Sequence, residues 1–201
     1  MVLTDAQLLK GRDPVAACRA AVRGGVTAVQ VRLPGAPPRD IVALARTLVG
    51  ALAVPVLVND RVDVALAARA AGAHLGQDDA PLALLRPHVP PGFILGISVG
   101  SPAEAAKARG WPADYWSIGP CFATTHKPDA GSPLGAAGFA ALARLGPLPP
   151  GLPVLGIGGI TAANIGSVMR AGASGVAVIG AIWEASDPEA AARALRAALA
   201  P

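Results

Sequence analysis

Short apolar runs alternate with longer alanine-rich segments along the whole chain. The runs are rich in valine and isoleucine and alternate poorly with polar residues, which is typical of parallel strands covered on both faces. This pattern predicts strands at residues 1–4, 27–31, 54–58, 73–75, 93–97, 114–118, 153–157 and 175–179. The segments between them predict helices at residues 13–23, 38–52, 61–71, 80–87, 102–109, 136–145, 161–171 and 187–199.

Glycine and capping residues mark the ends of several predicted helices. Glycine after the last helical turn commonly ends a helix in the left-handed conformation. Such a glycine stands just before a strand at Gly24-Gly25, Gly72, Gly110 and Gly172. At the other end, Thr161 is expected to cap the seventh helix, and Asp187-Pro188 opens the last one with a cap and an N1 proline.

Eight strand–helix units in 201 residues predict one compact (β/α)8 barrel, a TIM barrel, that spans residues 1–201 without a domain boundary. A doubly wound open sheet is the alternative, but no Gly-x-Gly-x-x-Gly motif follows the first strand. Two segments are expected to be irregular, the Pro-rich turn at 34–38 and the loop at 119–135.

Composition narrows the class of protein. Hydrophobic residues make up 53% and charged residues 15% of the chain, which argues against disorder. The net charge of +4 is scattered and aromatics are few, so we expect anionic small-molecule substrates and no nucleic acid. Cys18 and Cys121 lack metal-ligand spacing. No apolar run is long enough for a membrane span and no targeting segment is evident, so we expect a cytoplasmic protein; a homodimer stays open.

The stretch 155–161 and its echo at 176–182 are apolar strands that run into glycine and then open a helix. Glycine lets the backbone approach a ligand closely, and barrels of this kind often hold phosphate after strands seven and eight. Gly158, Gly159, Ile179 and Gly180 are therefore candidate phosphate-binding residues. The alternative is that these glycines only permit close packing of helix on sheet.

Polar residues collect where the predicted strands end, which is where barrel active sites lie. Asp60 and Asp79 would supply the one or two carboxylates that Mg²⁺ takes alongside substrate phosphates. Arg32 and Lys127 can hold phosphate oxygens, the first with a bidentate fork and the second as a point charge. Taken singly, either aspartate can be a helix cap and Arg32 a surface charge. His74, between Ala73 and Leu75, is expected to be a buried core histidine.

The chain resembles the thiamine phosphate synthase family and its relatives the thiazole tautomerases. The resemblance covers nearly the whole length and rests on the order and spacing of several motifs. They are Val58-Asn59-Asp60, His74-Leu75-Gly76-Gln77-Asp78-Asp79, Gly96-Ile97-Ser98, Gly119-Pro120 with Thr124-Thr125-His126-Lys127 and Pro133-Leu134-Gly135, and Gly156-Ile157-Gly158-Gly159-Ile160.

The resemblance implies a transferase that joins hydroxymethylpyrimidine diphosphate to thiazole phosphate and releases pyrophosphate. It implies a dissociative route, in which pyrophosphate leaves with the help of magnesium, a pyrimidine-stabilised cation forms, and the thiazole nitrogen attacks. Asp60 and Asp79 would bind Mg²⁺, with Arg32, Ser98 and Lys127 as catalytic residues. The pyrimidine diphosphate would be held by Gln30, Arg32, Asn59, Ser98 and Lys127. The thiazole phosphate would be held by Thr124, Thr125, Gly159, Ile179 and Gly180.

The chain departs from the family pattern at four positions. Pro34 replaces a diphosphate-binding lysine, and Gly100 replaces a histidine that follows the fifth strand. His126 replaces the second threonine of a Thr-x-Thr-Lys motif, and Gly180 replaces a serine after strand eight. These changes keep two alternatives open. One is a thiazole tautomerase-like enzyme with His126 as acid or base, and the other is a non-catalytic binder of a phosphate ligand.

Overall fold

The computed structural model describes residues 1–9, 11–126, 131–146 and 150–199. The strands form one parallel sheet in which each pairs with its sequence neighbour. They are β1 (Val2–Leu3), β2 (Val29–Val31), β3 (Val56–Asn59), β4 (Gly72–Leu75), β5 (Ile94–Val99), β6 (Tyr115–Ile118), β7 (Val154–Ile157) and β8 (Gly175–Ala177). Each overlaps its predicted range.

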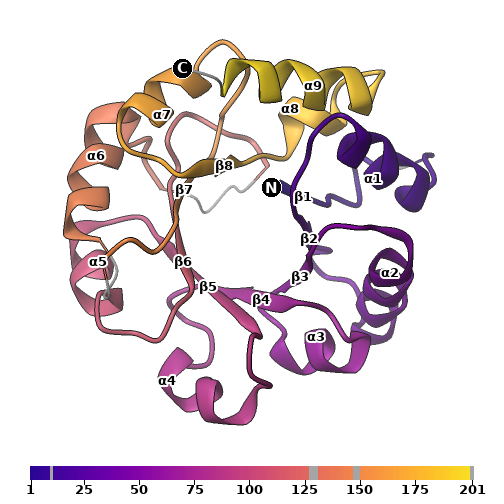
Figure 1. Ribbon diagram of the computed structural model, residues 1–201, viewed down its shortest axis with the longest axis horizontal. Helices are drawn as coiled ribbons and strands as arrows, with labels where there is room; N and C mark the ends of the chain where they lie inside the picture. Colours follow the sequence, from indigo (N-terminus) through magenta and orange to yellow (C-terminus); the bar gives the residue numbers. More distant parts are fainter. Residues whose placement is uncertain (10, 127–130, 147–149, 200–201) are drawn as a thin grey trace.

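The sheet closes on itself between β1 and the end of β8. Val2 bridges Val178, and the Leu3 N–H donates to the Val178 carbonyl at 3.0 Å. Figure 1 shows the resulting ring of strands with the helices around its outside. The (β/α)8 barrel is thus confirmed, and the open sheet is excluded because a closed ladder has no edge strands.

Helices follow the strands as the pattern predicts. They are α1 (Pro14–Arg23), α2 (Pro38–Ala51), α3 (Val62–Ala68), α4 (Leu82–Leu85) with the 3₁₀ turn η1 (Arg86–His88), α5 (Pro102–Ala108), α6 (Gly135–Leu145), α7 (Ile165–Arg170), α8 (Gly180–Trp183) and α9 (Pro188–Ala198). Within the described ranges, none of these helices has the length and hydropathy that a membrane crossing requires.

The pleat of the strands separates two environments. Val29 and Val31 on β2 are fully buried in the main hydrophobic cluster between sheet and helices, while Gln30 between them lies on the opposite face. The same alternation puts His74 on β4 and Tyr115 on β6 on the inner face, where they are hydrogen-bonded to each other. The barrel interior therefore carries polar side chains, and the outer layer carries most of the apolar core.

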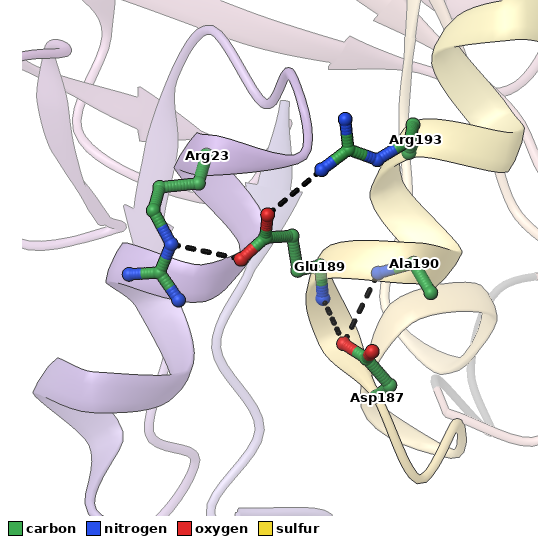
Figure 2. A network of polar contacts seen from close by, with 5 residues as sticks. All are labelled: Arg23, Asp187, Glu189, Ala190 and Arg193. Atoms are coloured by element: carbon green, nitrogen blue, oxygen red, sulfur yellow. Dashed lines mark hydrogen bonds and ion pairs between the residues drawn. The ribbon is translucent and has the colours of Figure 1, made fainter.

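The first and last helices lie side by side at the closing seam of the barrel, in indigo and yellow in Figure 1. Figure 2 shows how polar groups connect them. Glu189 on α9 accepts from Arg23 Nε on α1 at 2.8 Å and from Arg193 on its own helix at 2.8 Å. Asp187 caps α9, as predicted, by accepting from the N–H groups of Glu189 and Ala190.

The start of the seventh helix differs from the prediction of 161–171. α7 begins only at Ile165, and Thr161 does not cap it. Instead, the Asn164 side chain accepts from the Thr161 N–H at 2.8 Å and donates to the Gly159 carbonyl at 2.9 Å. This local bonding holds residues 161–164 in a turn, an alternative to helix that asparagine side chains commonly offer.

Two of the four glycine positions that were predicted to end helices have the left-handed conformation. Gly25 and Gly172 have positive φ angles of 107° and 100°. Gly110 does not, and Gly72 is the first residue of β4, where a Cβ atom would collide with the Ile94 backbone. α3 ends earlier, at Arg69 with φ 55°, so Gly72 is required for close approach of two strands and not for the helix end.

The stretch 176–182 opens a helix at Gly180, as expected, and this short helix α8 is separate from the predicted last helix. It begins at Gly180 directly after the strand, and its Trp183 is fully buried. The indole Nε1–H of Trp183 donates to the Leu3 carbonyl of β1 at 2.6 Å. This bond ties the end of the chain's last strand–helix unit to its first strand, so the place of Gly180 depends on a contact far apart in sequence.

The contacts in Figure 2 predict that the cap of α9 matters more than its ion pairs. Asp187→Ala removes the acceptor for two N–H groups and should lower the free energy of unfolding by about 1 kcal/mol. Glu189→Gln should cost less, because Arg23 and Arg193 are mostly exposed and exposed pairs contribute roughly 0–1 kcal/mol. Urea unfolding followed by circular dichroism measures both.

Asp187→Asn is the control, since asparagine is an equally good cap and should unfold like the unmodified protein. The effect of Glu189→Gln should shrink at high salt while that of Asp187→Ala persists. An Asp187→Ala protein as stable as the Asn variant would show that the cap contributes nothing.

Candidate active site

The carboxyl ends of the parallel strands form one rim of the barrel, and the predicted site residues follow them. At the end of β1, Thr4 is fully buried. Its hydroxyl accepts from the Arg32 N–H at 2.8 Å and donates to the Arg32 carbonyl at 3.0 Å. Thr4 thereby fixes the backbone of Arg32 directly after β2, while the partly buried Arg32 side chain extends from this anchored position.

The chain turns sharply after Arg32. The Ala36 N–H donates to the Leu33 carbonyl at 3.1 Å, with Pro34 and Gly35 between them and Gly35 at φ 75°. A proline followed by a residue with positive φ is the pattern of a type II turn. The predicted Pro-rich turn is confirmed, and Pro34, which stands where the family pattern has a lysine, is exposed in it.

Gln30 lies inside the barrel with 2% of its surface exposed. Its Oε1 atom is buried and has no hydrogen-bond partner among the described residues. A buried acceptor without a partner costs free energy, and native structures leave few of them. Gln30 is therefore suited to receive a hydrogen bond from a ligand at the barrel mouth.

Asp60 directly follows β3, and Asp79 lies in the loop after the neighbouring strand β4. The Asp60 N–H donates to the His74 carbonyl at 2.7 Å, and Asp60 itself has φ 62° and an exposed side chain. Asp79 Oδ2 accepts from the Gly76 N–H at 2.6 Å, which folds the loop back on the strand. Among the described residues no group of three or more metal-ligating side chains occurs. Two carboxylates beside a phosphate site are a donor set that suits Mg²⁺.

Ser98 lies at the carboxyl end of β5, next to β4. Its Oγ is 2.9 Å from His74 Nε2, and its carbonyl accepts from Gln77 Nε2 at 2.7 Å. Ser98 is thus held from both its side chain and its backbone by residues of β4 and the following loop. The expected burial of His74 is confirmed, but the structure also connects it to a predicted site residue.

The glycine stretch after β7 packs against the loop after β6. The N–H groups of Cys121 and Phe122 donate to the carbonyls of Ile157 and Gly158 at 2.7 and 3.0 Å. Gly158 and Gly159 have φ angles of 90° and 61°, and a Cβ atom on either would collide with residues 120–123. Close packing of backbone on backbone thus requires both glycines, whether or not they also bind phosphate.

His126, at the end of the described part of this loop, reaches α8. Its Nε2 lies 3.0 Å from Glu184 Oε1, and a Cβ atom on Gly180 would collide with the imidazole. The imidazole thus lies directly against Gly180, and a larger residue at position 180 would require the histidine side chain to shift. Thr124 accepts from the His126 N–H at 3.3 Å, Thr125 is exposed, and Ile179 precedes α8. Lys127 lies outside the described residues.

Comparison with known proteins identifies the family. A family model described as thiamine monophosphate synthase matches residues 1–182. The thiamine-phosphate synthase of Roseiflexus castenholzii is 48% identical over 197 residues, which are 96% of this chain and 85% of that protein. The chain belongs to the thiamine monophosphate synthase family.

Two further members agree with this assignment. The thiamine-phosphate synthase of Xanthobacter autotrophicus is 49% identical over 201 residues, or 98% of this chain and 93% of that protein. The solved structure of thiamine phosphate pyrophosphorylase from Pyrococcus furiosus has a TM-score of 0.85 at 35% identity and covers 98% of this chain and 93% of that one. Membership of the synthase family makes the chain an enzyme of the transferase class.

Sequence reasoning missed three side chains that shape this synthase-family site. Thr4 was noted only as a strand end, Tyr115 was placed in a strand without a role, and Glu184 was not considered. Thr4 and Tyr115 form hydrogen bonds with residues of other strands, and the sequence does not show which side chains of different strands meet. The one available signal was their polar character within otherwise apolar strands.

The packing of the loops after β6 and β7 predicts a large cost for Gly158→Ala. Gly92→Ala is the matched control, because Gly92 has a similar φ of 80° but no atom within 4 Å of a built Cβ. Its loss of unfolding free energy therefore measures the backbone strain alone, roughly 1–3 kcal/mol. Gly158→Ala adds a collision with Pro120 and should cost about 1–3 kcal/mol more. Thermal and urea unfolding compare the two variants, and equal losses would contradict the packing argument.

Proposed function

We propose that this protein is a thiamine phosphate synthase, which joins hydroxymethylpyrimidine diphosphate to thiazole phosphate and releases pyrophosphate. The observation that carries the proposal is the joint position of Gln30, Asn59 and Ser98, at the carboxyl ends of β2, β3 and β5. The family pattern assigns all three to the pyrimidine diphosphate. Relatives 48–49% identical over nearly the whole chain are named for this reaction.

The pyrimidine ring would enter the barrel mouth beside Gln30. The buried Gln30 Oε1 can accept a hydrogen bond from the heterocycle, which would remove the cost of leaving it without a partner. The diphosphate would then extend over the rim toward Arg32, whose guanidinium can bind phosphate oxygens with two parallel N–H groups. Lys127 is proposed as a second cation on the diphosphate.

Mg²⁺ would be held by Asp60 and Asp79 together with oxygens of the diphosphate. The exposed Asp60 and the loop-anchored Asp79 offer oxygen donors after the neighbouring strands β3 and β4, which fits the preference of this hard cation. When bound there, the ion supplies neutralisation of the charge that develops on the leaving pyrophosphate.

The chain's own contribution to the reaction is positioning and electrostatic stabilisation. Arg32 and Lys127 would bind the diphosphate, and the Ser98 hydroxyl would donate to it as the C–O bond breaks and negative charge accumulates. No protein nucleophile is required by this dissociative route. Burial raises the pKa of Cys18 to about 12 and that of Cys121 to about 11, so both remain unreactive thiols.

The thiazole phosphate would lie at the opposite part of the rim. Gly159, Ile179 and Gly180 offer backbone near that place, and Thr124 and Thr125 offer hydroxyl groups from the loop after β6. His126 would replace the missing hydroxyl contacts with its imidazole, which Glu184 holds at 3.0 Å beside Gly180. The lost serine and threonine would then be exchanged for one larger donor.

A turnover assay tests the proposed function. Purified protein receives hydroxymethylpyrimidine diphosphate, thiazole phosphate and Mg²⁺, and both thiamine phosphate and pyrophosphate are measured, with EDTA as the control. We expect magnesium-dependent formation of both products in equal amounts. Thiazole phosphate binding without turnover would instead favour the non-catalytic binder, and isomerisation of the thiazole alone would favour a tautomerase.

The metal site predicts that Asp60→Asn and Asp79→Asn each lower kcat by about 100-fold or more, because several kcal/mol of charge stabilisation is lost. Both substitutions preserve the local fold. Asparagine tolerates the positive φ of residue 60, and at residue 79 it can still accept from the Gly76 N–H. Magnesium titration of the rate and of intrinsic fluorescence should show weaker binding in both variants.

Asp78→Asn is the matched control, since Asp78 is an exposed neighbour of Asp79 in the same loop. It should leave kcat and the magnesium dependence unchanged. Full magnesium-dependent turnover in Asp60→Asn and Asp79→Asn would place the ion elsewhere.

A further inference from the structure

A series of hydrogen bonds inside the barrel connects the neighbouring strands β4, β5 and β6 and ends at Ser98. Tyr115 on β6 contacts His74 Nδ1 through its hydroxyl at 2.9 Å, and His74 Nε2 contacts Ser98 Oγ at 2.9 Å. His74 and Tyr115 are each only 6% exposed, and their rings stack at a centroid distance of 5.4 Å. Gly96 makes room for this arrangement, because a Cβ atom there would collide with the Tyr115 ring.

The neighbours of Tyr115 determine which group donates in each of these hydrogen bonds. A neutral imidazole has one N–H donor and one acceptor nitrogen, so His74 accepts from one hydroxyl and donates to the other. Burial raises the pKa of Tyr115, and the Gln30 side chain partly offsets this increase, as a donor near the phenol oxygen does. The Tyr115 proton is then directed at His74 Nδ1, and the tautomer assigned from this network carries its proton on Nε2.

This tautomer of His74 determines where the Ser98 hydroxyl can donate its proton. With His74 Nε2–H donating to Ser98 Oγ, the serine proton cannot point back at the histidine and is available to a bound ligand. The backbone of Ser98 is fixed as well, through the bond from Gln77 to its carbonyl. Both rotation of the hydroxyl and movement of the strand end are restrained before any ligand arrives.

We propose that His74, supported by Tyr115, is a positioning residue that orients the Ser98 hydroxyl toward the leaving diphosphate. This inference rests on the proposed function. A preoriented donor stabilises charge that develops in the transition state without paying for reorganisation at that moment. His74 itself need not touch the substrate, so its effect should pass entirely through Ser98.

A double-mutant cycle between His74 and Ser98 tests the inference by steady-state kinetics. Ser98→Ala should lower kcat about 100-fold, as loss of an oxyanion donor does. His74→Leu should lower kcat roughly 10- to 100-fold through misplacement of the hydroxyl, with little change in KM for the diphosphate. The double variant should be no slower than Ser98→Ala alone, because the two residues act as one unit.

Two conservative variants keep the test valid if His74→Leu fails to fold. His74→Gln retains an amide within reach of Ser98 and should recover part of the lost kcat. Tyr115→Phe keeps the stacked ring but removes the group that sets the tautomer, and its loss of kcat should also disappear in the Ser98→Ala background.

Ser117→Ala is the matched control. Ser117 is a buried serine on β6 in direct register with Ser98, and its Oγ has no hydrogen-bond partner within the described part of the chain. Its substitution should leave kcat unchanged. Circular dichroism and thermal unfolding confirm that each variant is folded at the assay temperature.

Two results would overturn the positioning role while the proposed function stands. They are an unchanged kcat in folded His74→Leu, and an equal loss from His74→Leu in the unmodified and Ser98→Ala backgrounds. Absence of thiamine phosphate formation by the unmodified protein is a different result, which removes the proposed function and the inference with it.

Discussion

Closure of the backbone ladder between β1 and β8 is the constraint on which the rest of this molecule depends. The hydrogen bonds of Val178 with Leu3 and Met1 join the first strand to the last and leave the sheet without an edge. Closure creates an interior, gathers the carboxyl ends of all strands at one rim, and fixes α8 through the bond from Trp183 to Leu3. The described side chains proposed for the active site take their positions from that geometry.

A closed interior also imposes a rule on its polar side chains, because buried donors and acceptors are costly when they lack partners. His74 and Tyr115 meet this rule by bonding to each other and to Ser98. Gln30 does not meet it completely, since its Oε1 has no partner among the described residues. Ser117 Oγ is a second such atom. In the proposed function a ligand supplies the donor that Gln30 lacks, which connects the packing of the barrel to the proposed chemistry.

The glycines after β7 have a packing role that is independent of any ligand. Gly158 and Gly159 are required by the close approach of the loop after β6, so their presence alone does not establish a phosphate site. The pairing of His126 with Gly180 is more informative. Both positions depart from the family pattern, and the imidazole of one fills the space that the other leaves. The two departures therefore meet in the structure, at the contact between the loop and α8.

The barrel, the order of its strands and main helices, and the polar residues such as Asp60 and Asp79 at the strand ends could all be predicted from the sequence. This was possible because hydrophobic periodicity and capping signals are local and repeat in every unit. Tertiary contacts were needed to show that Thr4 anchors Arg32 and which residues meet one another in the barrel interior. Those outcomes depend on side chains from different strands meeting, and the sequence does not encode such distances locally.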